Sequence, residues 1–479
     1  MSRRGHVLAL LPVLAAGAAL TLVGLRAPDS GLVPAAPATK SVDERTLTCF
    51  GLPSSLPSSQ QGAPVPRSLA AGPGRVDAPG IDAGIGGWDV TTLPASNRAA
   101  VEVAATGAAA RTVTGVSALR APPAAGAGLA TQQCGEPARR WWFVGAGSGR
   151  VRDGTILLRA PAGVDAVVDL LLRGPDGALN AVGTDDLRVA AGVTVAVRLS
   201  RVVAGTEEVA VEVIASQGRV VAALADTWGG GVEPQGTEWL PASAEPATTV
   251  LVPGVEGPAV LVVANATDAS VVARPTLMTS SGRAVVAGAE TVQVTAGGVG
   301  TVELPGSVRP GTTVEVRADG AVTAAVRTQT GADVALRTGA TDLAGPTVVP
   351  LDVGAAARDS ALVVAAELVD PDEQEARSRA VEVAGFDASG SRVGSGRLRV
   401  DAGTSVAVDL ADVLGLAPPE LDELAYAVLN PAKADAATVP VVASLELTGP
   451  GGSSVLPLRS PVTTVTVPAL VPRVVPPTG

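Results

Sequence analysis

A block of short apolar segments recurs along the sequence, and this repeat limits the fold more than any other feature. The first block begins at Gly154 and contains V-T-V-A-V-R-L, in which Val193, Val195 and Val197 alternate with other residues. Such alternation is typical of a strand with one buried face. Echoes follow in L-V-V-A-N-A-T-D from Leu261 and in A-L-V-V-A-A-E-L from Ala361. Blocks therefore recur about every hundred residues, as in an internal repeat.

Each block holds about seven or eight strand-like segments separated by turn residues, which predicts an all-β chain of tandem immunoglobulin-like β-sandwiches. Connector segments begin at Thr248, Pro346 and Thr463, and W-W-F-V at Trp141 takes the same place before the first block. Strand motifs at both ends of a chain also fit a closed, propeller-like ring. The repeat is about twice as long as a propeller blade. The sequence therefore favours tandem sandwiches, with the ring as the alternative, and short helices are expected only near Asp412.

Composition and charge narrow the classes of partner. Aromatic residues make up 2% of the chain although 47% of it is hydrophobic. Cores of Val, Ala and Leu suit thin β layers. The net charge of −11 argues against nucleic acid as a partner, because phosphates require a basic face. It argues equally against electrostatic docking on anionic lipid.

The N-terminus has the features of a membrane-targeting segment. Arg3 and Arg4 precede an uncharged stretch, residues 5–25, which is about as long as a bilayer-spanning helix. We predict a signal anchor over residues 1–27, with a cleaved signal peptide as the alternative. The bulk of the chain is then extracytoplasmic, because the basic end stays inside. The protein is expected in the cell membrane as a single-pass protein, or secreted if the segment is cleaved.

The remaining chain divides by composition into five parts. The predicted parts are a flexible tether at 28–45, an irregular N-terminal β unit at 46–140, and β-sandwich repeats at 141–247, 248–345 and 346–479, the last with a C-terminal strand. Cys49 and Cys134 bracket the irregular unit and are the only two cysteines. In an exported protein two cysteines most often pair, so we expect a disulfide, with free thiols as the alternative.

Residue types exclude most catalytic chemistry. The single histidine is His6, inside the apolar N-terminal segment. Ser-His-Asp and Cys-His catalysis and histidine-bearing metal sites are therefore not expected, and we predict no cofactor, no metal and no enzymatic activity. The carboxylates Asp370, Asp372, Glu373 and Glu375 could bind calcium, but they lack the D-x-D-x-D-G spacing of a calcium loop. A solvated loop is the favoured interpretation.

Four tryptophans are the remaining candidate site. They lie around the first block, whereas the later blocks have none, and they are Trp141, Trp142, Trp228 and Trp239. Flat rings on a β surface can stack on sugars or on a partner. Packing in the first core is the favoured interpretation and a ligand or partner surface is the alternative. Separately, Asn265 begins an N-A-T glycosylation sequon.

Several of these features occur together. They are a basic start, one apolar segment, a cysteine before a Pro-rich run, C-G-E-P-A-R-R-W-W-F from Cys134 and blocks of the L-V-V-A-N-A-T-D kind. In this combination the chain resembles an uncharacterised family of exported, membrane-anchored proteins from high-GC Gram-positive (actinobacterial) bacteria. The resemblance covers nearly the whole chain. It implies an envelope protein with β-sandwich repeats and no known activity.

These observations predict a non-enzymatic protein of the cell envelope, an extracytoplasmic scaffold or binding module of unknown ligand. The alternative is a carbohydrate-binding or carbohydrate-acting envelope protein that uses the tryptophan cluster. The expected partners are the membrane, through the N-terminal helix, and either cell-wall polysaccharide or another envelope protein. Nucleic acid is not among them.

Overall fold

The computed structural model describes residues 32–51, 63–64, 67–78, 81–85, 89–93, 100–121, 128–203, 205–230, 233–330, 333–351, 359–369, 377–432, 439–449 and 452–472. The predicted signal segment at 1–27 lies outside these residues, and so do Asp370, Asp372, Glu373 and Glu375. Within the described stretches, no helix combines the length and the apolar character needed to cross a membrane.

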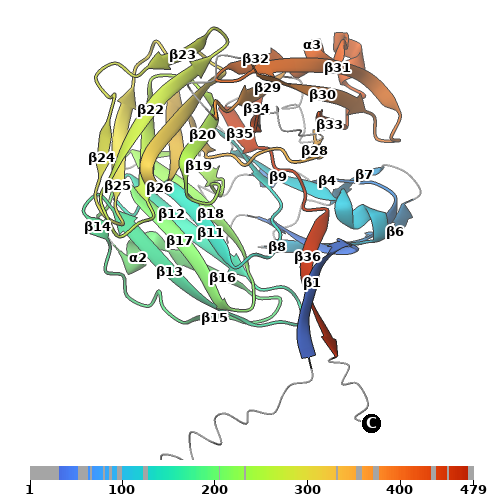
Figure 1. Ribbon diagram of the computed structural model, residues 1–479, viewed down its shortest axis with the longest axis horizontal. Coiled ribbons are helices and arrows are strands. Elements are labelled where there is room, and N and C mark those ends of the chain that lie inside the picture. Colours follow the sequence, from blue (N-terminus) through green and yellow to red (C-terminus); the bar gives the residue numbers. More distant parts are fainter. Residues whose placement is uncertain are drawn as a thin grey trace, which may run out of the picture. The chain divides into compact units, whose positions relative to one another are not determined.

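The chain is all-β, as predicted, and divides into two compact units. The larger unit runs from Asp43 to Pro461 (Figure 1). Its strands form four consecutive modules: module 1 (residues 44–133), module 2 (140–240), module 3 (247–338) and module 4 (347–457). Each module has a buried core made mainly of its own residues, to which module 1 adds Val116, Ala118 and Leu129 in module 4 and module 3 adds Val334 and Leu336 in module 2.

Module 1 consists of two sheets over one core. One sheet has the order β2-β8-β5-β6, and the other has the order β10-β9-β4-β7 with β3 beside β9. The elements are β2 (Glu44–Phe50), β3 (Ala63–Pro64), β4 (Arg67–Ala71), β5 (Gly74–Ala78), β6 (Ile81–Ile85), β7 (Asp89–Leu93), β8 (Ala100–Thr106), the 3-10 helix η2 (Gly107–Arg111), β9 (Thr114–Ala121) and β10 (Gly128–Gln133). Leu47, Leu69 and Val103 join the sheets in one buried core.

The two sheets of module 1 correct the prediction of an irregular unit at 46–140. Several of its strands have only five residues, and Pro and Gly are frequent between them. Strands this short carry little alternation, so their pattern is weak in the sequence although their side chains still meet in a common core.

Module 2 also consists of two sheets over a common core. The orders are β11-β17-β13-β14 with β15 beside β13, and β16-β12-β18-β19. The elements are β11 (Arg140–Ala146), β12 (Arg152–Arg159), β13 (Ala166–Gly174), β14 (Gly177–Ala178), β15 (Leu187–Val189), β16 (Thr194–Arg198), α2 (Leu199–Val202), β17 (Val209–Gln217), β18 (Val221–Gly230) and β19 (Glu233–Leu240). Ile156 from one sheet and Leu170 and Val211 from the other are fully buried in this core.

Module 3 differs because one long strand belongs to both of its layers. The elements are β20 (Ala247–Val255), β21 (Ala259–Asn265), β22 (Val271–Thr279), β23 (Gly282–Val285), β24 (Val292–Val294), β25 (Val299–Leu304), β26 (Thr312–Thr330) and β27 (Asp333–Thr338). The first half of β26 pairs with β22 and the second half with β21 and β27. Between the halves, a Cβ at Gly320 would lie 2.6 Å from Val271 Cγ1. A residue without a side chain is therefore required where the strand passes from one layer to the other.

Module 4 returns to two sheets, β28-β33-β30-β31 and β32-β29-β34-β35. The elements are β28 (Thr347–Pro350), β29 (Asp359–Ala366), β30 (Ser378–Phe386), β31 (Arg392–Asp401), β32 (Ser405–Asp409), α3 (Leu410–Leu414), α4 (Pro418–Leu421), β33 (Tyr426–Pro431), β34 (Val441–Gly449) and β35 (Gly452–Pro457). The two short helices lie where short helices were expected, and Asp409 Oδ1 caps α3 by accepting from Ala411 N.

The four modules contact one another in a closed cycle (Figure 1). Buried apolar clusters span each contact, and they include Phe50 and Trp239 for modules 1 and 2, Val144 and Val262 for modules 2 and 3, Leu251 and Val442 for modules 3 and 4, and Ala70 and Tyr426 for modules 4 and 1. Because modules 4 and 1 are in contact, the four modules do not form an open row. The spacing of the sequence repeats indicates the number and length of the modules, but it does not indicate whether the last module contacts the first.

The smaller unit is an antiparallel pair of strands from the two ends of the chain. Strand β1 (Leu32–Ser41) pairs with β36 (Thr464–Pro472), and Leu32 stands opposite Pro472. This pairing corrects two expectations. Residues 32–41 form a strand rather than a flexible tether, and the predicted C-terminal strand joins β1 rather than the last sandwich repeat. A Pro- and Ala-bearing segment becomes ordered here because a distant strand satisfies its backbone groups.

Candidate functional site

The last strands of the four modules meet in one place, which we call the central junction. These strands are β10, β19, β27 and β35, and each is the second strand of a hairpin. β10 contacts β19 and β35, and β27 contacts the same two strands. Each module therefore contributes one strand to a common region that is buried by the other three.

A buried hydroxyl connects three modules at the junction. Ser454 Oγ on β35 accepts a hydrogen bond from Thr131 N on β10 at 2.9 Å and donates to Glu238 Oε1 on β19 at 3.0 Å. Thr131 Oγ1 lies 2.8 Å from the same Ser454 oxygen. Because the Ser454 proton goes to Glu238, Thr131 Oγ1 is the donor in this third bond. All the hydrogen-bonding capacity of Ser454 is thus used to join modules 1, 2 and 4.

Glu238 is almost fully buried, at 4% exposure. Burial raises the pKa of Glu238 well above its usual range, and the nearby Asp333 carboxylate raises it further. The hydrogen bonds from Ser454 Oγ and from the backbone N–H of Trp239 lower it by less. No ion pair with Glu238 occurs among the described residues, so the protonated form is the one this environment favours.

Asp333 begins β27 and lies at the edge of the same junction. Its Oδ2 accepts from Ser453 N at 2.7 Å, which ties module 3 to β35. Burial raises the pKa of Asp333 to about 6, although the backbone N–H groups of Ser453 and Val334 and the charge of Arg337 lower it. One of the bonds between modules 3 and 4 is therefore made by a carboxyl group with a pKa of about 6.

Arg337 supplies the positive charge of the junction. Its side chain is fully buried, its Nη1 donates to Thr328 Oγ1 at 2.6 Å, and its Nη2 lies 3.2 Å from Glu446 Oε1 and 3.7 Å from Glu256 Oε1. Burial lowers the pKa of Arg337, and these carboxylates oppose that effect. The guanidinium is therefore engaged by module 3 and module 4 rather than by Glu238.

A second charged cluster lies between modules 2 and 3. Arg152 pairs with Asp226 at 2.7 Å and with Glu208 at 3.3 Å, and Arg327 of module 3 pairs with Glu208 at 2.6 Å. The guanidinium carbons of Arg152 and Arg327 lie 4.4 Å and 5.3 Å from the ring centroid of Trp228. Burial raises the pKa of Asp226, and Arg152 lowers it. This cluster joins two modules through buried ion pairs and cation–π contacts.

The four tryptophans do not form one exposed face. Trp142, Trp228 and Trp239 are 2%, 5% and 1% exposed. Trp141 is half-buried; it packs over Gly135, and its Nε1 donates to Val220 O at 2.9 Å. Trp239 packs between modules 1 and 2, and Trp228 in the core of module 2. Of the predicted surface, only part of the Trp141 ring faces solvent.

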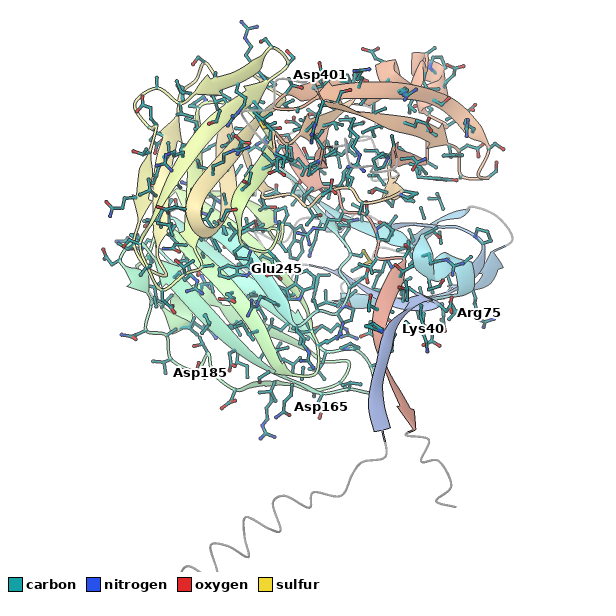
Figure 2. The ribbon with its side chains drawn as sticks, viewed as in Figure 1. Lys40, Arg75, Asp165, Asp185, Glu245 and Asp401 are labelled. Carbon is teal, nitrogen blue, oxygen red and sulfur yellow. A yellow bond between two sulfur atoms is a disulfide. The ribbon has the colours of Figure 1, made fainter. Side chains whose placement is uncertain are left out.

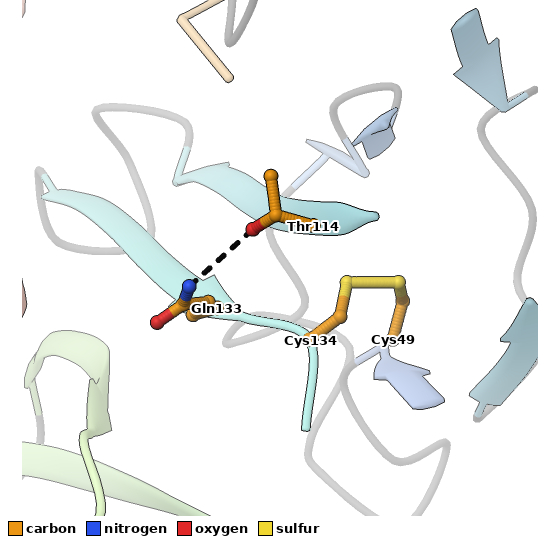
Figure 3. Close-up of a disulfide and its surroundings, with 4 residues drawn as sticks. All are labelled: Cys49, Thr114, Gln133 and Cys134. Carbon is orange, nitrogen blue, oxygen red and sulfur yellow. Dashed lines mark hydrogen bonds between the residues drawn. A yellow bond between two sulfur atoms is a disulfide. The ribbon is translucent and has the colours of Figure 1, made fainter. Parts of the chain in front are cut away.

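The predicted disulfide is present. Cys49 at the end of β2 and Cys134, directly after β10, are bonded (Figure 3), and no described cysteine is free. The bond connects the two sheets of module 1. Beside it, Gln133 Nε2 donates to Thr114 Oγ1 at 3.4 Å (Figure 3).

The sequon residue Asn265 has a structural role. Its side chain is fully buried, its Nδ2 donates to Ala269 O and Thr295 O, and its Oδ1 accepts from the backbone and hydroxyl of Thr267. An amide used in this way is not accessible for glycosylation.

Sequence reasoning missed the junction residues Thr131, Glu238, Asp333, Arg337 and Ser454. A signal does exist, because T-E-W-L and D-V-A-L-R-T place a charge inside strand-like segments of mostly apolar residues. A charge at an inward strand position indicates a buried pair or network. Among the described residues, no group of three or more His, Cys, Asp or Glu side chains is arranged to bind a metal ion.

A family model described as a family of unknown function (DUF5719) matches residues 90–411, about two thirds of the chain. The match runs from the middle of module 1 to α3 of module 4 and so includes Glu238, Asp333 and Arg337. No curated protein matches the sequence.

Proposed function

The chain belongs to the DUF5719 family, whose function is unknown, and we propose that it is a non-enzymatic scaffold or binding module of the cell envelope. In this proposal residues 5–25 hold it at the membrane, modules 1 to 4 are extracytoplasmic, and their layers are immunoglobulin-like sandwiches. Its partner is cell-wall polysaccharide or another envelope protein.

The scaffold proposal is supported above all by the contacts of the buried polar groups, which join one module to another. Ser454, Glu238 and Arg337 bind partners on other modules, as do Arg327 and Glu208 at the second cluster. Buried charges elsewhere in proteins often serve catalysis. Here they are engaged in joining one module to the next, which supports a structural role for the body of the protein.

The extracytoplasmic location is supported by the disulfide. The Cys49–Cys134 bond belongs to an oxidising compartment, because cytosolic thiols are kept reduced. The acidic net charge of −11 suits a soluble exterior body.

Cell fractionation tests this proposal. A C-terminally tagged chain is expected in the membrane fraction, accessible to protease added to intact cells whose wall has been removed. Deletion of residues 1–27 is expected to leave the chain in the cytoplasm with Cys49 and Cys134 reactive toward maleimide. Crosslinking in intact cells, followed by identification of the adducts, then names the partner. A full-length chain that stays cytoplasmic with reactive thiols would contradict the location, and release of sugar products from purified wall would contradict the non-enzymatic role.

A further inference from the structure

We propose that the central junction is a proton-dependent latch, which holds β35 of module 4 against modules 1 and 2 and releases it when Glu238 ionises. The inference is independent of where the protein resides. It rests on which groups meet Glu238 and on which contact in the cycle can separate.

The latch consists of few bonds, all of which converge on β35. Ser454 is fully buried and makes three hydrogen bonds, two with Thr131 and one with Glu238. The next residue, Ser453, donates its N–H to Asp333. Two consecutive residues of β35 therefore connect module 4 to each of the other three modules.

The charged groups that face Glu238 are mostly acidic. From β18, Asp226 stands directly opposite Glu238 in the strand pair. On β27, the Asp333 carboxylate raises the pKa of Glu238. The cation on the same strand is Arg337. The facing groups from β10 and β35 are the hydroxyls of Thr131 and Ser454.

The nearby cations already have closer acidic partners. Arg337 pairs with Glu446 and Glu256, and Asp226 is paired with Arg152. An ionised Glu238 therefore adds a negative charge that no described cation contacts. In a buried site such a charge is costly, and hydration relieves the cost.

The cycle can open at this place without breaking the chain. Modules 1 and 2, 2 and 3, and 3 and 4 are covalently consecutive, whereas modules 4 and 1 are joined by side-chain and strand contacts and by the pairing of β1 with β36 at the two ends of the chain. Withdrawal of β35 from Thr131 and Glu238 exposes the carboxylate to water and uncovers the part of the module 4 core that Val116, Ala118 and Leu129 of module 1 cover, while the cores of modules 2 and 3 stay closed. Proton loss at Glu238 is therefore expected to open the contact of module 4 with modules 1 and 2.

Hydrogen exchange of the full chain between pH 6 and pH 9 tests the latch, with rates corrected for the intrinsic pH dependence of exchange. In the wild type we expect the protection of β35 and β10 to fall at least tenfold over this range, while β12 and β17 in the core of module 2 stay protected. In Glu238→Gln, which keeps an acceptor and the shape of the side chain without a charge, the protection of β35 is expected to stay constant. Asp185→Asn is the control, because Asp185 is exposed on the outside of module 2 (Figure 2), and it is expected to behave as the wild type.

A second variant keeps the test decisive if Glu238→Gln does not fold. Ser454→Ala removes the connecting hydroxyl and leaves all charges in place, so β35 is expected to be weakly protected already at pH 6. The latch is refuted if wild-type protection of β35 does not change with pH, if Glu238→Gln shows the wild-type dependence, or if protection falls equally in all four modules. The last result would indicate a general loss of stability rather than opening.

Discussion

Removal of the Cys49–Cys134 bond should weaken module 1 and leave module 3 unchanged. The two cysteines are 85 residues apart in sequence and join the first strand of module 1 to the residue that follows its last strand. The closed loop thus contains almost the whole module. We consider the double variant Cys49→Ala, Cys134→Ala, because a serine would place a hydroxyl where Cys49 is fully buried.

The size of the expected stability loss follows from the length of the loop that the disulfide closes. A crosslink across about 85 residues lowers the entropy of the unfolded chain by an amount worth about 4.5 kcal/mol at room temperature, which is an upper figure because measured effects are typically about 2–4 kcal/mol. Since the loop lies inside module 1, this free energy is lost from the local unfolding of module 1. The strands β21 and β26 of module 3 lie outside the loop.

Native-state hydrogen exchange at constant pH measures the free energy of local unfolding in module 1 and in module 3. We expect the opening free energies of β2, β8 and β9 to fall by about 2–4 kcal/mol, and those of β21 and β26 to change by less than about 0.5 kcal/mol. Wild-type protein reduced with dithiothreitol is the matched control, because it lacks the bond but keeps both sulfurs. Unchanged protection in module 1, or an equal loss in module 3, would refute the assignment of the bond to local stability.

Three further predictions concern single side chains. Gly115→Ala should lower the free energy of unfolding by about 1–3 kcal/mol, because a Cβ at this position would lie 2.6 Å from Leu69 Cδ2 and 2.7 Å from Cys134 Sγ. Part of this loss should disappear in the variant without the two cysteines, which a double-mutant cycle of denaturant unfolding would measure. Arg337→Met should cost about 3–5 kcal/mol, since it leaves Glu446 without its buried cation, and adding Glu446→Gln should restore most of the loss in thermal unfolding. The pKa of Asp333 is raised to about 6 in the folded protein. The native state therefore binds a proton that the unfolded chain has already lost, and the free energy of unfolding falls as the pH rises from about 4 to about 6. Asp333→Asn should remove this pH dependence and, because the group is half-buried, raise the free energy of unfolding by about 1–2 kcal/mol at pH 7.5. A slope that persists in Asp333→Asn would contradict this origin.

The sequence predicted the local structure of this protein better than its long-range contacts. Alternating residues such as Val195 and Val197 lie in β16, and the cysteine count was enough to predict the disulfide. Module 1 was underestimated because its strands are short. The pairing of β1 with β36 was missed because it joins residues more than four hundred positions apart, and no local pattern indicates the partner of a strand.

The candidate site was harder to predict for a related reason. Tryptophans attract attention in a chain with 2% aromatic residues, yet three of the four are buried. Glu238 and Ser454 are ordinary residues in their own segments, and their hydrogen bond connects positions 216 apart. Their importance arises from the closure of the module cycle, which places four separate hairpins together.

The continuous strand β26 also has a mechanical consequence. In modules 1, 2 and 4 the two layers are separate sheets, so shear between them only requires side chains to slide. In module 3 the same backbone runs through both layers from Thr312 to Thr330, and shear would have to deform its peptide geometry near Gly320. Module 3 is therefore expected to be the most rigid of the four modules. The slowest-exchanging amides of the protein are expected along β26.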